Sequence, residues 1–442
     1  MPETPEKPIA WRIQGAVYGV GLFSNSSLHL YNVVVPIWAY ALTQDELLLG
    51  IIFGARHFLP MLLLIHGGAL MDRFGARRIT LYFAVAAMVI PPFYPVLPFV
   101  SALVILQMLG GLTVMTCWIG SQSLTGSIMR GKPVYTGRLT VATRIGAFVG
   151  PPLIGICLDV AGIKAAFLFL SLWSTLTLLF AIAIPKDEIR ESGSGEKTPP
   201  VTSGLRDIVP KLADYLDAFR LIAIPAIGLV VVVTLLRHSG VAMQSSFYVV
   251  YLNDLGISGT FIGLLFSLLG VCGGMGALFV GTVARRFSAR RILFVSLAIG
   301  VVMMTITPLI GGSGFTVGAA GIASFLDAMG IDAKLGPIAG VLGLYILFLI
   351  ATAIRGIASG VSQAMEISLV AQGAGVAGQG KGAALRVTIG RVAAVVLPII
   401  MGGAAKLFGL AISFYIVGGA ILAVIAFMAV RPSSAPAAST KP

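Results

Sequence analysis

Charge is the scarcest property of this sequence. Only 11% of its 442 residues are Asp, Glu, Lys or Arg, and 57% are hydrophobic, whereas soluble proteins carry roughly 25% charged residues. So little charge cannot cover a soluble fold, and we therefore expect a membrane protein. Acidic residues are rarer than basic ones, with 17 Asp and Glu against 30 Lys and Arg. Nucleic acid is excluded as a partner, because no basic cluster lies on a soluble face.

Cysteine and the motifs of catalysis are also lacking. The three cysteines, Cys117, Cys157 and Cys272, lie within apolar runs and are odd in number, which excludes a disulfide framework. The sequence has no P-loop, no Ser/His/Asp array and no Cys/His metal spacing, so we predict neither an enzyme nor a cofactor or metal site. The polar, acidic N-terminus does not resemble a cleavable signal peptide, and we expect the first span to direct insertion.

Long apolar runs, by contrast, are abundant. Runs long enough to cross a bilayer occur six times in each half of the chain, which predicts an all-α membrane protein with twelve transmembrane helices. The expected spans are residues 13–41, 47–69, 79–97, 101–127, 137–161, 165–184, 223–252, 260–283, 291–311, 339–369, 384–407 and 411–430.

These spans predict two bundles of six helices, at residues 1–184 and 223–442. The polar segment between them, residues 185–222, is expected to be a cytoplasmic linker. Apolar residues at helical spacing from Leu205 to Phe219 favour either an amphipathic surface helix or a solvated linker helix. Lys and Arg gather in alternate loops, and the opposite side has only Lys164, Lys334 and Lys406, which predicts cytoplasmic termini.

A charged turn between the second and third spans recurs in the second half. Gly68 and the Arg77-Arg78 pair return 213 positions later, at Gly281 and at Arg290-Arg291, and such an echo indicates a duplicated unit. Arg144 and Pro151 align with Arg391 and Pro398 at the larger offset of 247. We therefore expect an insertion near residues 311–340, on the exterior side.

These motifs resemble those of the major facilitator superfamily of secondary transporters, over essentially the whole chain. The run Gly68-x-x-x-Asp72-Arg73-x-Gly75-x-Arg77-Arg78 is similar to the family's loop signature, and Gly146-x-x-x-Gly150-Pro151-x-x-Gly155 is similar to a fifth-span motif of its drug/proton antiporters. The resemblance implies two pseudo-symmetric bundles that rock about a central site. Two departures are Arg285 in the place of Asp72 in the second copy, and Gln107 where antiporters usually carry Arg.

Two groups of motif residues have mechanical interpretations. The loop residues can form a conformational latch, in which Asp72 accepts hydrogen bonds from a helix N-terminus and the arginines stay among the headgroups. Alternatively, they only anchor the loop on the cytoplasmic side. In the fifth span, Gly146, Gly150, Pro151 and Gly155 permit close helix approach and bending, and are candidate hinge residues.

Charges within the spans are the candidate functional groups. Five arginines lie there, and Glu366 is the only acid well inside a span. Because an Arg at the bilayer centre costs about 2.5 to 3.5 kcal/mol, we expect a wet cavity in which an anionic solute supplies the missing charge. The candidate ligands are Arg237 and Arg355 first, then Arg56, with Arg144 and Arg391 either ligands or structural. The aromatic and amide side chains expected at cavity positions either shape specificity or only pack between helices; they are Asn25, Tyr31, Asn32, Trp118, Gln244, Tyr248 and Gln363.

Proton carriers are the remaining expectation. The candidates are Glu366, His57, His238 and His29, each of which has a structural alternative; for Glu366 this is a permanent ion pair with Arg355 or Arg391. We thus expect a monomeric, proton-coupled transporter of a small anion in the inner membrane of a bacterium. A drug or metabolite antiporter and a non-transporting sensor on a transporter fold are the alternatives.

Overall fold

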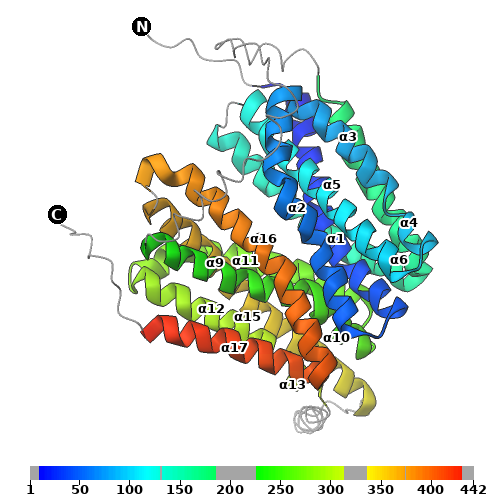
Figure 1. Ribbon diagram of the computed structural model, residues 1–442, viewed down its shortest axis with the longest axis vertical. Helices are drawn as coiled ribbons and strands as arrows, with labels where there is room; N and C mark the ends of the chain where they lie inside the picture. Colours follow the sequence, from blue (N-terminus) through cyan, green and yellow to red (C-terminus); the bar gives the residue numbers. More distant parts are fainter. Residues whose placement is uncertain (1–8, 130–131, 186–224, 313–335, 374, 431–442) are drawn as a thin grey trace, which may run out of the picture. The chain divides into compact units, whose positions relative to one another are not determined.

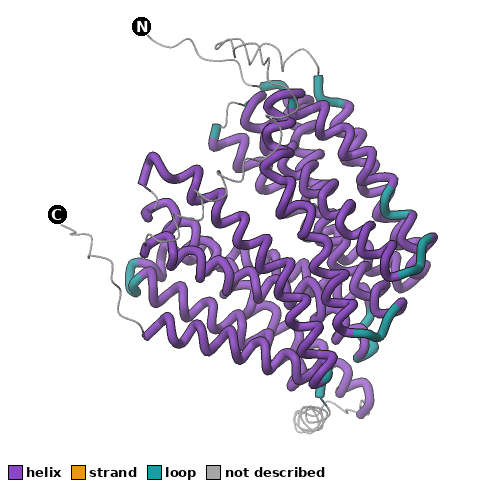
Figure 2. Tube along the Cα trace, viewed as in Figure 1, coloured by secondary structure: helices purple, strands orange, loops and turns teal. Residues whose placement is uncertain are grey.

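Every secondary-structure element of the described chain is a helix (Figure 2). The structure, a computed structural model, describes residues 9–129, 132–185, 225–312, 336–373 and 375–430. The expected linker at 185–222 and the insertion near 311–340 lie mostly outside these residues. Helices dominate because a lipid-exposed backbone must satisfy its N–H and C=O groups within its own segment.

The chain divides into two compact units. Unit 1 comprises Met1–Trp38 and Ala55–Lys211, and unit 2 comprises Ala39–Gly54 and Leu212–Pro442. The end of the first expected span and the start of the second, residues 39–54, therefore belong by their contacts to the second unit. The predicted boundary between two six-helix bundles stays a prediction.

Six helical elements lie among the described residues of the first half of the chain (Figure 1). They are α1 (Trp11–Leu42), α2 (Glu46–Phe74), α3 (Ala76–Val89), α4 (Phe93–Val96), α5 (Val100–Ile128) and α6 (Pro133–Ile182). The third expected span is interrupted between α3 and α4 by Pro91 and Pro92. The fifth and sixth expected spans both lie in α6, on either side of a kink at Gly162, where a φ of 77° is not helical.

The second half forms the remaining elements. They are α9 (Pro225–Met243), the π-helical turn η3 (Gln244–Tyr248), α10 (Val249–Asp254), α11 (Gly259–Ala284), α12 (Ala289–Thr305), α13 (Thr307–Gly311), α15 (Gly336–Gly373), α16 (Gly375–Phe408) and α17 (Leu410–Val430). The seventh expected span thus contains a π-helical turn, a feature often found at functional sites.

Glycines bring the helices of each unit close together. In unit 1, a Cβ at Gly146 would lie 2.7 Å from the carbonyl oxygen of Leu22, so α6 approaches the backbone of α1. In unit 2, a Cβ at Gly356 would lie 2.9 Å from the carbonyl oxygen of Leu269, which brings α15 against α11. Without a hydrophobic driving force between helices in lipid, such close packing is what holds a membrane bundle together.

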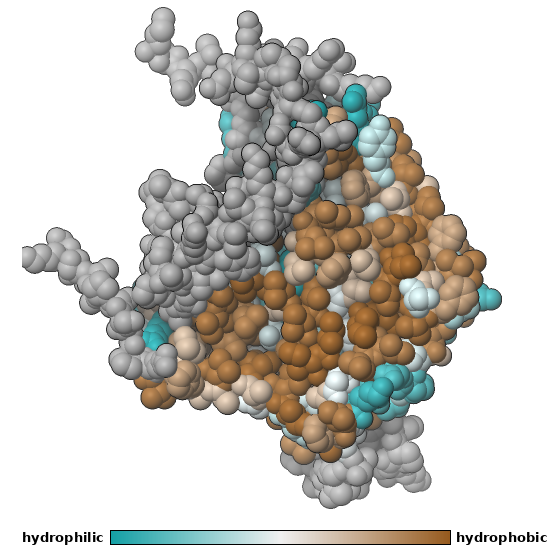
Figure 3. Space-filling model, in the orientation of Figure 1, coloured by the Kyte–Doolittle hydropathy of each residue, from teal (hydrophilic) through white to brown (hydrophobic). Residues whose placement is uncertain are grey.

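The outer faces of the helices are apolar. Leu168 and Leu172 on α6 and Leu278 on α11 are exposed, and hydrophobic residues cover most of the described surface that Figure 3 shows. Nine helical segments among the described residues are long and apolar enough to cross a membrane. The exposed apolar residues are therefore suited to lipid contact.

Candidate functional site

A small cavity in unit 2 brings together the two arginines that rank first as candidate ligands. Its volume is about 100 Å³, and α9, α11, α12 and α15 form its wall. Arg237 and Arg355 line it, and Gln244 begins the π-helical turn beside them. Its other polar lining residues are Ser296, Ser359 and Ser362.

Helical spacing places these groups on common faces. Along α15, Arg355, Ser359, Ser362 and Glu366 follow one another at intervals of four, three and four residues, which is one face of a helix. Arg237 and Gln244 are two turns apart on the α9–η3 segment. The serines were missed from the sequence, although their spacing from Arg355 was the pattern that could have found them.

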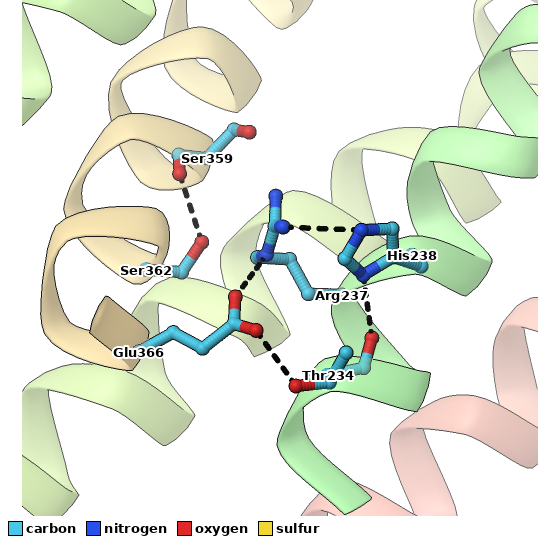
Figure 4. A network of polar contacts seen from close by, with 6 residues as sticks. All are labelled: Thr234, Arg237, His238, Ser359, Ser362 and Glu366. Carbon is cyan, nitrogen blue, oxygen red and sulfur yellow. Dashed lines mark hydrogen bonds and ion pairs between the residues drawn. The ribbon is translucent and has the colours of Figure 1, made fainter. Parts of the chain in front are cut away.

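Arg237 is held by a network of polar contacts (Figure 4). Its Nε forms an ion pair with Oε2 of Glu366, which has no exposed surface. Thr234 donates its hydroxyl hydrogen to Oε1 of Glu366 at 2.7 Å. A ring nitrogen of His238 lies 3.3 Å from Nη2 of Arg237, and the other lies 2.9 Å from the carbonyl oxygen of Thr234. The α9 groups thus converge on the single acid of α15.

This ion pair revises the expected partner of Glu366. The sequence suggested Arg355 or Arg391, whereas the structure shows an ion pair with Arg237. The residue spacing along each helix was visible in the sequence, but which helix faced which was not.

Arg355 is more buried than Arg237, and its contacts with an aromatic ring and a sulfur atom differ from the ion pair of Arg237. The residue is 6% exposed, and its guanidinium lies 4.8 Å from the centre of the Tyr248 ring. Its Nη1 lies 3.4 Å from the sulfur of Met304, which is a weak acceptor. Nε and Nη2 are both buried and have no hydrogen-bond partner among the described residues. Arg355 lines the cavity and therefore has two buried donors left over beside it.

Arg56, in unit 1, is held within its own bundle. It donates from Nη1 to Oδ1 of Asn32 at 2.6 Å and from Nη2 to the carbonyl oxygen of Leu28 at 3.0 Å. Its guanidinium also lies 4.9 Å from the centre of the Tyr31 ring. Tyr31 is buried, and its hydroxyl has no hydrogen-bond partner among the described residues. These contacts join α2 to α1 and give Arg56 a structural task.

The other candidate residues do not line this cavity. Arg144 is exposed on α6, whereas Arg391 is half-buried on α16. Next to Arg391, a Cβ at Gly390 would lie 2.7 Å from Nε2 of His238, so α16 borders the Arg237 network. The remaining half-buried candidates are His29 on α1, His57 on α2 and Gln363 on α15.

Comparison with known proteins decides the family. The model of the major facilitator superfamily matches residues 17–333, which is more than half of the chain. The chain belongs to the major facilitator superfamily. This membership confirms the expected all-α membrane fold, and makes the protein a secondary transporter rather than an enzyme.

Solved structures of other superfamily members share the fold of this transporter. A variant of the nucleoside transporter NupG aligns with a TM-score of 0.72 at 11% identity, covering 94% of this chain and 98% of that one. An occupied, inward-facing bacterial homolog of the human lysosomal transporter Spinster aligns at 0.66 and 12%, covering 97% and 100%. A POT family transporter in complex with 5-aminolevulinic acid aligns at 0.65 and 12%, covering 94% and 95%. No curated protein sequence matches the chain.

The loop signature of the superfamily occupies the junction of α2 and α3. Gly75 has a φ of 90°, which a residue with a side chain rarely adopts, and this explains the glycine. Arg77 donates to the carbonyl oxygens of Ile184 at 2.7 Å and Ile182 at 3.2 Å, at the end of α6. Arg73 and Arg78 are exposed. The side chain of Asp72 lies outside the described residues, so its latch role, shared with Gly68, stays a prediction.

The fifth-span motif lies within a continuous helix. Gly146 and Gly150 face α1, where added side chains would meet Leu22 and Leu30. Pro151 and Gly155 lie in the same helical stretch, and the break in α6 comes later, at Gly162. Close approach is therefore the visible function of these glycines, and a hinge role stays a prediction.

Proposed function

We propose that this secondary transporter moves a small anionic solute by alternating access, coupled to protons, and that Arg355 binds the anionic group. The observation that carries the proposal is the pair of buried donors, Nε and Nη2 of Arg355, which lack partners among the described residues. A buried unsatisfied polar group costs about 1 to 3 kcal/mol, and more for a charged one. A carboxylate, phosphate or sulfonate would satisfy both donors in bidentate geometry.

The size of the cavity favours an anionic head group over a bulky ligand. Pockets for drug-sized ligands are roughly 300 to 1,000 Å³, whereas this cavity has a volume of about 100 Å³. Ser359 can orient an anion further by donating its hydroxyl hydrogen, whereas Ser296 and Ser362 already donate to the carbonyl oxygens of Leu293 and Ser359.

Glu366 offers a route for proton coupling. While Glu366 is ionised, it pairs with Arg237 and competes with an anionic solute for that guanidinium. Protonation of Glu366 would release Arg237, so that the cavity would present two arginines to the solute. Loading of the anion and the proton together would then be favoured. His238 contacts the same network and is the second candidate for the proton.

The test is transport by the purified protein in proteoliposomes. Panels of carboxylates, phosphates and sulfonates are compared with cationic drugs, with and without a pH gradient. We expect uptake of one anionic class that responds to the gradient and is lost in Arg355→Gln. Lys164→Gln is the control, because it removes an exposed charge in α6 just after the kink at Gly162. We further expect a monomer with both termini in the cytoplasm of a bacterial cell.

Two other outcomes would replace the proposal. Transport of cations alone would favour the antiporter that the Gly146–Gly155 motif suggests. Binding of a ligand without flux would favour a sensor on a transporter fold.

A further inference from the structure

A second concave region lies on the other side of the contact between α12 and α15. This groove has a volume of about 390 Å³ and is separate from the Arg355 cavity, with which it shares only Ser296. Its lining residues are Val283, Phe287, Arg291, Ile292, Val295, Ser296, Ile299, Ile354, Ile357, Ala358 and Val361. Arg291 is the only charged residue among them.

The groove is open and apolar along its length. Val295 and Ile299 on α12 and Ile354 and Ile357 on α15 are each between 39% and 52% exposed. From Arg291 to Ile299 the helix rises about 12 Å, at 1.5 Å per residue. One leaflet of the hydrocarbon core is about 15 Å thick, half of the whole core. The groove therefore matches much of the depth reached by one acyl chain.

Positive charge is concentrated at one end of this groove. Arg285 and Arg286 lie in the turn between α11 and α12, and Arg290 and Arg291 lie in the first turn of α12. Residues 259–311 include no acid. Arg290 is used within the protein, because its Nη2 donates to the carbonyl oxygen of Met428 at 2.6 Å. Arg285, Arg286 and Arg291 are exposed. Three cationic side chains thus surround the end where Phe287 and Arg291 line the groove.

We propose that the groove between α12 and α15 binds one acyl chain of an anionic phospholipid, whose phosphate lies on Arg291, Arg285 and Arg286. The apolar walls suit any lipid chain, and the charge complementarity at the end selects an anionic headgroup. Basic pockets between transmembrane helices bind such headgroups, and each arginine near the surface adds roughly a fivefold gain in affinity. Ser296 would place the bound chain against a wall of the Arg355 cavity.

The test measures lipid binding by the full-length protein in detergent. Phosphatidylglycerol and phosphatidylcholine with identical chains are titrated, and bound lipid is counted by native mass spectrometry while melting temperature is followed. We expect phosphatidylglycerol to bind on the order of 100-fold more tightly than phosphatidylcholine, because three gains of roughly fivefold multiply. Glycerol 3-phosphate is expected to cause no shift, which separates a lipid site from a phosphate site.

Two variants identify the two parts of the site. The triple variant Arg285→Gln/Arg286→Gln/Arg291→Gln should lose the preference for phosphatidylglycerol while keeping its affinity for phosphatidylcholine. Val295→Trp should fill the groove and weaken both lipids. The control Arg73→Gln/Arg78→Gln removes exposed charge from the corresponding turn of the first half, and should keep the preference.

The proposal is overturned if the triple variant keeps the wild-type preference. It is also overturned if the control loses the preference equally, since general surface charge would then explain the binding. A full shift with glycerol 3-phosphate would replace the lipid by a soluble phosphate. None of these measurements depends on transport. The lipid proposal can therefore fail or succeed independently of the anion proposal.

Discussion

Arg77 and Arg290 hold equivalent positions in the two halves of this transporter. Arg77 donates hydrogen bonds to the carbonyl oxygens of Ile182 and Ile184 at the end of α6, and Arg290 donates to that of Met428 near the end of α17. Each arginine thus closes the last helix of its own half. The last carbonyls of a helix lack intrahelical partners and carry the negative end of its dipole.

Removal of Arg77 is expected to destabilise the protein. Arg77→Ala deletes two charge-assisted hydrogen bonds, which contribute roughly 1.5 to 3 kcal/mol each when buried and less here, because the residue is partly exposed. We expect a loss of about 1 to 2 kcal/mol, measured by thermal unfolding in detergent. Arg78→Ala is the matched control, since Arg78 is exposed, and should change little. Equal effects of the two variants would refute the capping role.

The backbone at Gly75 provides a second prediction. Its φ of 90° is unfavourable for any residue with a Cβ. Gly75→Ala should therefore cost about 1 to 3 kcal/mol. Ser288 occupies the equivalent position of the second copy with a φ of −63°, so Ser288→Ala should be nearly neutral. Thermal unfolding of both variants checks this, and a neutral Gly75→Ala would contradict the required conformation.

The ion pair between Arg237 and Glu366 is expected to show strong energetic coupling. Arg237→Gln leaves a carboxylate buried without its partner, at a cost of about 3 to 5 kcal/mol. In the double variant Arg237→Gln/Glu366→Gln both charges are gone, so most of this loss should be recovered. A double-mutant cycle on unfolding free energies measures the coupling. Additive losses would mean that the pair is not formed in solution.

The ion pair between Asp45 and Lys406 is expected to make stability depend on pH. In unit 2, Lys406 donates to Oδ2 of Asp45 at 2.5 Å, and Oδ1 accepts from the N–H groups of Leu47 and Leu48. Chiefly the hydrogen bond from Lys406 lowers the pKa of Asp45 below its ordinary value of 3.8. Stabilisation by a carboxylate with a lowered pKa is complete above the ordinary value and is lost as pH falls through the lowered one.

The variant Asp45→Asn isolates the charge, because Asn also caps helix N-termini well. At pH 7 we expect a lower melting temperature for Asp45→Asn than for wild type, and the difference should disappear as the pH falls below 3.8. Lys406→Gln should behave like Asp45→Asn. A pH-independent difference between Asp45→Asn and wild type would exclude the ion pair as its cause.

Much of the fold was predictable from the sequence, because lipid imposes one simple rule. Spans must be apolar and helical, so hydropathy located the helical elements of both halves. One interruption was foreseen and the other was not. The kink at Gly162 lies where the fifth expected span ends, between residues 161 and 165. Pro91 and Pro92 separate α3 from α4 within one apolar run, and this local backbone event is not recorded in hydropathy.

The residues of the candidate site could be selected from the sequence, but the pairs that they form could not. Scarcity of acids drew attention to Arg237, Arg355 and Glu366, because each is costly at membrane depth. The partner of Glu366 depends on the rotation of α9 against α15, which a single sequence does not contain. For Arg56, a contact with Asn32 from the neighbouring helix supplies the compensation that we had expected from a solute.

Binding of the transported anion to Arg355 variants tests the central claim most directly. With the anion that proteoliposomes identify, thermal-shift titrations compare wild type, Arg355→Lys and Arg355→Gln. We expect strong stabilisation of wild type, weaker stabilisation of Arg355→Lys, which keeps the charge and loses the planar fork, and none of Arg355→Gln. Stabilisation of folded Arg355→Gln to the same extent as wild type would contradict the assignment of Arg355 as the anion-binding residue.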